Sequence, residues 1–171
     1  LFAGIDPIHD LYKQLDGVAE YIENISFNIN GRLDFSAYEY ECAWPLALEN
    51  ALEPYHIGMV HPGTLAALKL EDGTNTFYGS NSVWQAPIGD VRIKKQLEKL
   101  GSLFNIDYGY RGYMSIFMFP FTMISSTFGY SYSLQNFFPS QTRVDRTNFM
   151  SRLLTCNARD EHAKKIIQPF L

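Results

Sequence analysis

Residues 44–65 read WPLALENALEPYHIGMVHPGTL and contain two of the four histidines of this 171-residue chain. His56 and His61 follow Glu53 in a segment that is otherwise apolar enough to be buried. Burying such polar side chains costs free energy unless they have partners. Neutral imidazoles ligate divalent iron, copper and zinc, and a nearby carboxylate can orient them. The stretch therefore indicates a metal site.

The two histidines are five residues apart, whereas a spacing of four places two ligands on one face of a regular helix. On an undistorted helix these two side chains point roughly 140° apart. Pro54, Gly58 and the Pro62-Gly63 pair flank or separate them, and such residues interrupt or end helices. We therefore predict that the helix is broken here. The spacing alone is equally compatible with a buried helix that holds two structural histidines.

The segment resembles the iron-binding segment of Rieske non-heme iron oxygenases, the large subunits of ring-hydroxylating oxygenases and their demethylating relatives. The family pattern is Glu-Asn, two apolar residues, an acidic residue, any residue, Tyr-His, four residues and His, as in residues 49–61. The resemblance implies that His56 and His61 are two of three ligands of a mononuclear iron(II). It also implies that Glu53 links this iron to the Rieske cluster of a neighbouring subunit, and that Asn50 lies near the iron.

The third ligand implied by the resemblance is an acidic residue on the last long helix. Asp160 and Glu161 are of the right type but lie early in the chain, so we expect this ligand beyond Leu171. The Rieske signature, Cys-x-His followed by Cys-x-x-His, is missing, and Cys42 and Cys156 have no nearby histidine. These two cysteines cannot hold a two-iron two-sulfur cluster. We expect that 2Fe-2S cluster in a missing N-terminal domain.

The resemblance also predicts the domain organisation. Residues 1–7 are similar to the strand and Asp-Pro that close the Rieske domain in this family, and we interpret them as the end of such a domain or a linker. Residues 8–171 then form the catalytic iron-binding domain, which we expect to be incomplete at its C-terminus.

Composition limits the partners of the protein. A length of 171 residues and a hydrophobic content of 46% fit one domain with a sizeable core. The net charge of -4 gives no reason to expect nucleic acid or a membrane surface as a partner. Two distant cysteines fit a reducing compartment, and we expect a cytoplasmic protein, although the sequence permits one disulfide.

Periodicity and turn residues predict the remaining elements. We expect a helix over Leu11–Tyr21, and a second helix over Val91–Phe104 whose basic side faces solvent. The expected strands are Ile25–Asp34 with a turn at Asn30-Gly31, Ala37–Ala43, Asn75–Gln85, Tyr113–Phe119, Met123–Phe128, Tyr130–Pro139 and Thr147–Cys156, before a helix that begins over Asp160–Ile167. This order is typical of an α+β domain. The resemblance implies a helix-grip (START-like) fold, in which a curved antiparallel sheet surrounds a C-terminal helix.

A curved sheet of this kind encloses a cavity in which a substrate can bind. Among the apolar residues of the predicted strands we select Met118, Phe128 and Tyr130 as substrate-binding candidates. The resemblance implies activation of dioxygen at iron(II) to hydroxylate an aromatic or other small organic substrate. It further implies electrons from a Rieske cluster, a ferredoxin or reductase as donor, and a homotrimer or a multiple of it.

Two other functions remain open. The first is a non-catalytic helix-grip module that binds a hydrophobic ligand, with His56 and His61 as structural residues. The second is a zinc metallohydrolase, although the four-residue histidine spacing usual in such enzymes is absent. Iron, zinc or no metal in the purified protein distinguishes the three.

Overall fold

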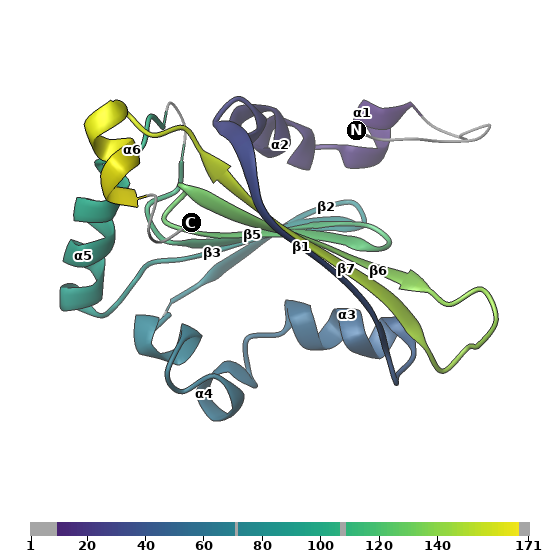
Figure 1. Ribbon diagram of the computed structural model, residues 1–171. Helices are drawn as coiled ribbons and strands as arrows, with labels where there is room; N and C mark the ends of the chain where they lie inside the picture. The colour runs from purple at the N-terminus through teal and green to yellow at the C-terminus, as the bar shows by residue number, and fades with distance from the viewer. Residues whose placement is uncertain (1–9, 71, 107–108, 168–171) are drawn as a thin grey trace.

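The computed structural model describes residues 10–70, 72–106 and 109–167 (Figure 1). Its strands are β1 (Ile29–Tyr40), β2 (Thr74–Tyr78), β3 (Asn81–Ala86), β4 (Tyr113–Met118), β5 (Thr122–Thr127), β6 (Ser131–Pro139) and β7 (Thr147–Cys156). Its helices are α1 (Leu11–Leu15), α2 (Val18–Ser26), α3 (Trp44–Leu52), α4 (Ile57–Val60), the 3-10 helix η1 (Leu65–Leu68), α5 (Val91–Gly101) and α6 (Glu161–Ile167).

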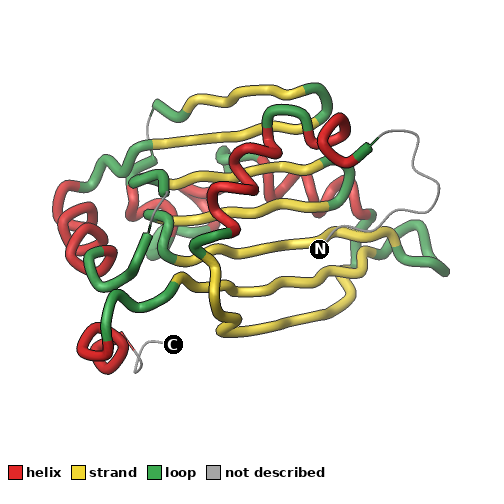
Figure 2. Tube along the Cα trace, turned by 90° about the horizontal axis from the view of Figure 1, so that it is seen from above, coloured by secondary structure: helices red, strands yellow, loops and turns green. Residues whose placement is uncertain are grey.

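The strands form one seven-stranded antiparallel sheet in the order β1-β7-β6-β5-β4-β3-β2. Figure 2 shows them side by side, with helical segments lying across the sheet. The run from β3 to β7 is a meander, because each strand pairs with the next one along the chain. This curved sheet confirms the predicted α+β fold class.

The four strands predicted after residue 112 agree with β4 to β7 to within one residue at each end. These segments are rich in aromatic and β-branched residues and are separated by Pro, Gly and Ser, which makes their boundaries readable. The predicted beginning of a helix over Asp160–Ile167 is confirmed by α6. The predictions for residues 1–7 and for the chain beyond Ile167 concern residues that the structure does not describe.

Four predictions for residues 11–85 are wrong. The helix expected over Leu11–Tyr21 is divided in two at Asp16-Gly17, where a Cβ on Gly17 would lie 2.1 Å from the Tyr78 ring. Residues 25–26 belong to α2 and not to a strand, because Ile25 is buried against the sheet. Long-range packing here outweighs the local alternation of apolar residues.

Asn30-Gly31 is not a turn, because β1 continues through it as one strand paired along β7. The register shifts between Ile29 and Gly31, so the Asn-Gly pair lies at an irregularity of the ladder. Conversely, the strand expected over Asn75–Gln85 is a hairpin of β2 and β3. Its turn contains Gly79 at a φ of +57°, a conformation that glycine adopts readily.

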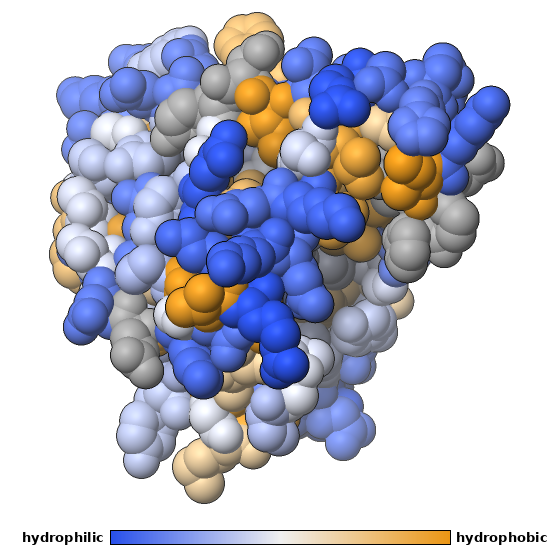
Figure 3. Space-filling view, turned by 90° about the vertical axis from the view of Figure 1, so that its left-hand side faces the viewer, coloured by the Kyte–Doolittle hydropathy of each residue, from blue (hydrophilic) through white to orange (hydrophobic). Residues whose placement is uncertain are grey.

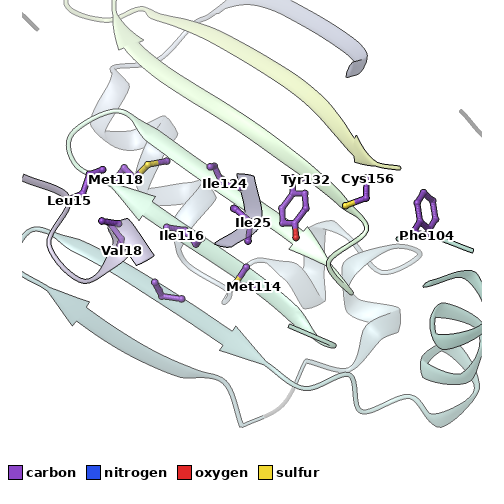
Figure 4. Packing of buried hydrophobic residues seen from close by; sticks show 12 residues of the cluster. Leu15, Val18, Ile25, Phe104, Met114, Ile116, Met118, Ile124, Tyr132 and Cys156 are labelled. Atoms are coloured by element: carbon purple, nitrogen blue, oxygen red, sulfur yellow. The ribbon is translucent and has the colours of Figure 1, made fainter. Parts of the chain in front are cut away.

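Helices cover both faces of the sheet. On one face, α1 and α2 enclose the larger core, in which Val18 and Ile25 pack with Met114, Ile116 and Tyr132 (Figure 4). On the opposite face, α3 packs through its buried Leu48 against side chains of β5, β6 and β7 (Figure 1). Because side chains alternate along a strand, neighbouring residues of each strand belong to different cores.

The helices α5 and α6 lie at one end of the sheet (Figure 1). α5 turns Ile93, Leu97 and Leu100 inward and its basic residues outward, as predicted. Figure 3 views the side of the molecule that carries α5 and α6, and this surface is largely hydrophilic.

Cys42 and Cys156 are both free. Within the described part of the chain, no helix has the length and apolar character needed to cross a membrane.

Candidate functional site

The predicted helix break lies at the end of α3. Glu53 ends this helix with an extended backbone, at φ -86° and ψ 131°. Pro54 explains that conformation, since a proline sterically disfavours the helical region for the residue before it. The chain then leaves the helix axis and enters the short helix α4.

The two histidines frame α4, with His56 preceding its first residue and His61 following its last. The backbone N–H of Val60 donates to the His56 carbonyl at 2.9 Å, and that of His61 donates to the Ile57 carbonyl at 3.0 Å. These bonds make α4 a single α-helical turn, and His61 leaves the helical conformation at φ -120° and ψ 47°. The ring centres of His56 and His61 lie 5.3 Å apart, with their planes at 70°.

Glu53 holds His56 in place. Its Oε1 lies 2.6 Å from Nδ1 of the ring, and its Oε2 accepts the His56 backbone N–H at 3.2 Å. Partial burial acts to raise the pKa of Glu53, but the hydrogen bonds from the His56 ring and from the backbone outweigh it and lower the pKa. An ionised Glu53 accepts a proton-bearing Nδ1–H, so the lone pair of His56 lies on Nε2.

The spacing of the two rings is compatible with one metal ion between them. An ion about 2.1 Å from a ligating nitrogen lies about 3.2 Å from the centre of that imidazole, so two rings 5.3 Å apart can both reach it. A carboxylate on the far ring nitrogen is the usual partner of a metal-bound histidine. Over residues 10–70, 72–106 and 109–167, however, no group of three or more His, Cys, Asp and Glu side chains is placed to hold an ion.

The acidic candidates for a third ligand are engaged elsewhere. Asp160 accepts hydrogen bonds from the Arg159 side chain and from the Ala163 backbone at the start of α6. Glu161 pairs with Lys164 on the same helix, at 3.7 Å. Both carboxylates therefore belong to the beginning of α6.

A cavity of about 920 Å³ lies between the α3–α4 segment and the sheet. The helical wall contains the four residues selected from the motif, Asn50, Glu53, His56 and His61, and also Leu46, Ala47, Ile57 and Leu65. The sheet wall contains Tyr40, Trp84, Tyr113, Ser115, Met123, Ser125, Thr127, Ser131, Ser133, Gln135, Phe137, Phe149 and Leu153. The structure thus brings all four motif residues to one cavity.

The three substrate-binding candidates do not line this cavity, and the proposed site does not include them. Met118 lies in the core beneath α1 and α2, on the opposite face of the sheet (Figure 4). Phe128 is buried in a small core with Leu68 and Ile88, and Tyr130 stacks on Phe104 with ring centres 4.9 Å apart. Their apolar character reflects core packing.

Sequence reasoning missed the aromatic and hydroxyl residues of the sheet wall. Trp84 and Tyr113 meet edge to face there, with ring centres 5.5 Å apart. A usable signal was the alternation in residues 113–117, in which Tyr113, Ser115 and Phe117 share one face. The three substrate-binding candidates are large apolar residues, which pack in cores, whereas cavities form where side chains are small or polar.

The antiparallel sheet of this α+β domain carries the histidine pair and the cavity on one face. The profile of the ring hydroxylating alpha subunit (catalytic domain) family matches residues 32–165, and the chain belongs to this family of oxygenase domains. No curated protein matches the chain significantly.

Solved structures share the fold. The quaternary ammonium Rieske monooxygenase CntA in complex with inhibitor MMV12 has a TM-score of 0.68 at 15% identity, over 97% of this chain and 42% of that one. Its complex with substrate L-carnitine has a TM-score of 0.67 at 15% identity, over 97% of this chain and 41% of that one. The chain thus spans about two fifths of the length of these proteins.

Proposed function

We propose that this domain is the catalytic part of an oxygenase that holds one iron(II) at His56 and His61 and hydroxylates an aromatic or other small organic substrate. The observation that carries the proposal is the arrangement of Glu53, His56 and His61, in which a broken helix brings two imidazoles together over a cavity. Bound iron(II) with open positions supplies activation of dioxygen. The third ligand and the 2Fe-2S cluster belong to parts of the protein outside the described residues.

The chain's own residues would have distinct roles. His56 and His61 bind the ion through ring nitrogens, and Glu53 fixes the orientation of His56 and its Nδ1 proton. Asn50 lies on the same wall of the cavity. The sheet wall would hold the substrate.

Glu53 is also suited to face a partner. Its side chain is 40% exposed, and the residues around it include exposed Tyr55, Met59 and Val60. Exposed apolar side chains clustered in this way are typical of protein contact sites. We propose that the Rieske domain of a neighbouring subunit binds here and passes electrons through Glu53 and His56, within a homotrimer or a multiple of it. A ferredoxin or reductase would supply those electrons.

The domain boundary belongs to the same proposal. Residues 1–7 would lead in from a Rieske-type domain, and residues 8–171 would be the catalytic portion. A solved structure of a quaternary ammonium Rieske monooxygenase gives insights into inter-subunit electron transfer in that enzyme. This chain is similar to it with a TM-score of 0.65 at 14% identity, over 95% of this chain and 42% of that one.

Metal analysis tests the proposal. We expect the full-length protein, purified without air, to contain one equivalent of mononuclear iron beyond any cluster iron. His56→Ala and His61→Ala should each lose that equivalent. His162→Ala is the matched control, because His162 is exposed on α6, and it should retain the iron. Full iron content in both site variants would contradict the assignment.

The non-catalytic binding module is the second candidate. It is favoured by the size of the cavity and by the lack, within the described residues, of a group of three metal-binding side chains. This candidate predicts no bound metal in the full-length protein and unchanged ligand binding in His56→Ala. Zinc in place of iron would instead favour the hydrolase.

A further inference from the structure

Three serines lie in a row across the sheet wall of the cavity. Ser115 on β4 is paired with Ser125 on β5, and Ser125 is paired with Ser133 on β6. All three line the cavity. Directly opposed side chains on neighbouring strands are close, and three strands about 4.8 Å apart give a row of about 10 Å. This row places three hydroxyl groups on the wall opposite the α3–α4 segment.

Apolar residues close the row at both ends. Trp84 on β3 is paired with Ser115, and Leu153 on β7 is paired with Ser133. Serine is much smaller than either neighbour, so the middle of the wall is recessed between two bulky side chains. Hydrogen-bonding groups are therefore confined to the middle of the wall, and a ligand with one polar group can bind there in one orientation.

Ser115 supplies an independent sign that something binds there. Ser115 is only 8% exposed, and its side chain makes no hydrogen bond among the described residues. In the described part of the chain, every fully buried side-chain nitrogen or oxygen has a partner. The Ser115 hydroxyl must therefore open into the cavity that it lines. The hydroxyl therefore has unused hydrogen-bonding capacity that a ligand in the cavity can take up.

The other two serines have one polar neighbour each. Ser133 accepts a hydrogen bond from Nε2 of Gln135 at 3.3 Å. Ser125 interacts with the hydroxyl of Tyr113, an interaction that lowers the pKa of Tyr113 against a larger rise caused by burial. Both serines keep further hydrogen-bonding capacity, since a hydroxyl can donate once and accept twice.

The charges around the cavity limit what can bind. Among the described residues that line it, none is Lys or Arg, and Glu53 is the acidic one. At the serine row, on the wall opposite the histidine pair, a carboxylate or phosphate would find no cationic side chain, and burial of an unpaired charge is costly. A neutral hydroxyl or carbonyl oxygen loses far less on leaving water and regains hydrogen bonds from the serines.

We propose that Ser115, Ser125 and Ser133 form a subsite that orients the substrate by a hydroxyl or carbonyl oxygen, and that the preferred substrates carry no negative charge. The rest of the substrate then lies in the cavity between Trp84, Tyr113 and the histidine pair. That the bound ligand is a substrate rests on the proposed function. The binding of the ligand at the three serines does not depend on the metal.

Direct binding of three matched probes tests the subsite. Naphthalene, 2-naphthol and 2-naphthoate share one ring system and differ in one substituent, and titration of the full-length protein by calorimetry gives their dissociation constants. We expect 2-naphthol to bind most tightly and 2-naphthoate least tightly. In Ser115→Ala, the affinity for 2-naphthol should fall about three- to tenfold, as expected for loss of one hydrogen bond, while that for naphthalene stays unchanged.

Ser151→Ala is the matched control, because Ser151 is a half-buried strand serine on β7 that does not line the cavity. It should bind all three probes as the unmodified protein does. If Ser115→Ala does not fold, as judged by circular dichroism, Ser133→Ala takes its place with the same expectation.

Two results would overturn the subsite. One is an equal affinity of Ser115→Ala and the unmodified protein for 2-naphthol, and the other is tighter binding of 2-naphthoate than of 2-naphthol. Failure of the proposed function is seen separately. If His56→Ala and His61→Ala leave the metal content unchanged while Ser115→Ala selectively weakens 2-naphthol, the oxygenase assignment is wrong and the subsite stands.

Discussion

Oε1 of Glu53 lies 2.6 Å from Nδ1 of His56, and this contact joins the end of α3 to the start of α4. The same carboxylate accepts the backbone N–H of His56 through its other oxygen. Glu53 thus controls both the position of the ring and the nitrogen that carries its proton. The polar core of the candidate site depends on this one side chain.

The variant Glu53→Gln tests that dependence. Both histidines remain, so we expect iron to be retained, but turnover with a reduced electron donor should fall by about 10- to 100-fold because the partner of a ligating histidine is altered. Metal analysis beside a single-turnover assay of the full-length protein measures the two effects. Glu49→Gln, on the exposed side of α3, is the control and should behave like the unmodified protein.

Met118→Ala should destabilise the domain without affecting ligand binding. Met118 is 4% exposed in the core under α1 and α2, and such truncations cost about 2–5 kcal/mol of unfolding free energy. Urea unfolding measures the loss. Val144→Ala is the control, since Val144 is 94% exposed between β6 and β7 and does not line the cavity. A normal stability combined with weakened 2-naphthol binding would place Met118 in the substrate site after all.

Gly89→Ala should disturb the segment that follows the histidines. A Cβ at residue 89 would lie 2.6 Å from the carbonyl oxygen of Lys69, and the Gly89 N–H bonds to the Leu68 and Lys69 carbonyls. The backbone of η1 must therefore shift, at about 1–3 kcal/mol of unfolding free energy. Gly63→Ala, where a Cβ meets nothing within 4 Å, is the matched control and should be close to neutral in the same unfolding measurement.

The carboxylate of Asp90 should make the free energy of unfolding depend on pH in the acid range. Its carboxylate caps α5 by accepting the N–H groups of Ile93 and Arg92, and it pairs with Lys69. The hydrogen bond from Ile93, aided by Lys69 and opposed by desolvation, lowers the pKa of Asp90 from its ordinary 3.8. A lowered pKa means that the ionised group stabilises the fold above pH 3.8, and that this contribution is lost as the pH falls through the lower value.

We therefore expect Asp90→Ala to be less stable than the unmodified protein at pH 7, with a difference that shrinks as the pH falls below 3.8. Denaturant unfolding across that range measures it. Asp90→Asn keeps a capping side chain and should retain most of the stability at pH 7. A difference for Asp90→Ala that stays constant down to pH 2 would contradict the capping role of the carboxylate.

Local patterns in the sequence were sufficient for much of the fold. The strands β4 to β7 follow from aromatic and β-branched runs bounded by turn residues, and the helix break follows from Pro54. The motif from Glu49 to His61 identified the family through its spacing. All of these signals act over a few residues, and they are readable without knowing what the chain packs against.

Contacts between distant residues decided the rest. Residues 25–26 became helix because Ile25 is buried on the sheet, and β1 passed through Asn30-Gly31 because β7 pairs along its length. The same holds for the binding wall, since Ser115, Ser125 and Ser133 become neighbours only through strand register. The sequence by itself determined the histidine motif and the order of the strands. The tertiary structure decided which face of the strands lines the cavity, because that depends on which helices cover each face of the sheet.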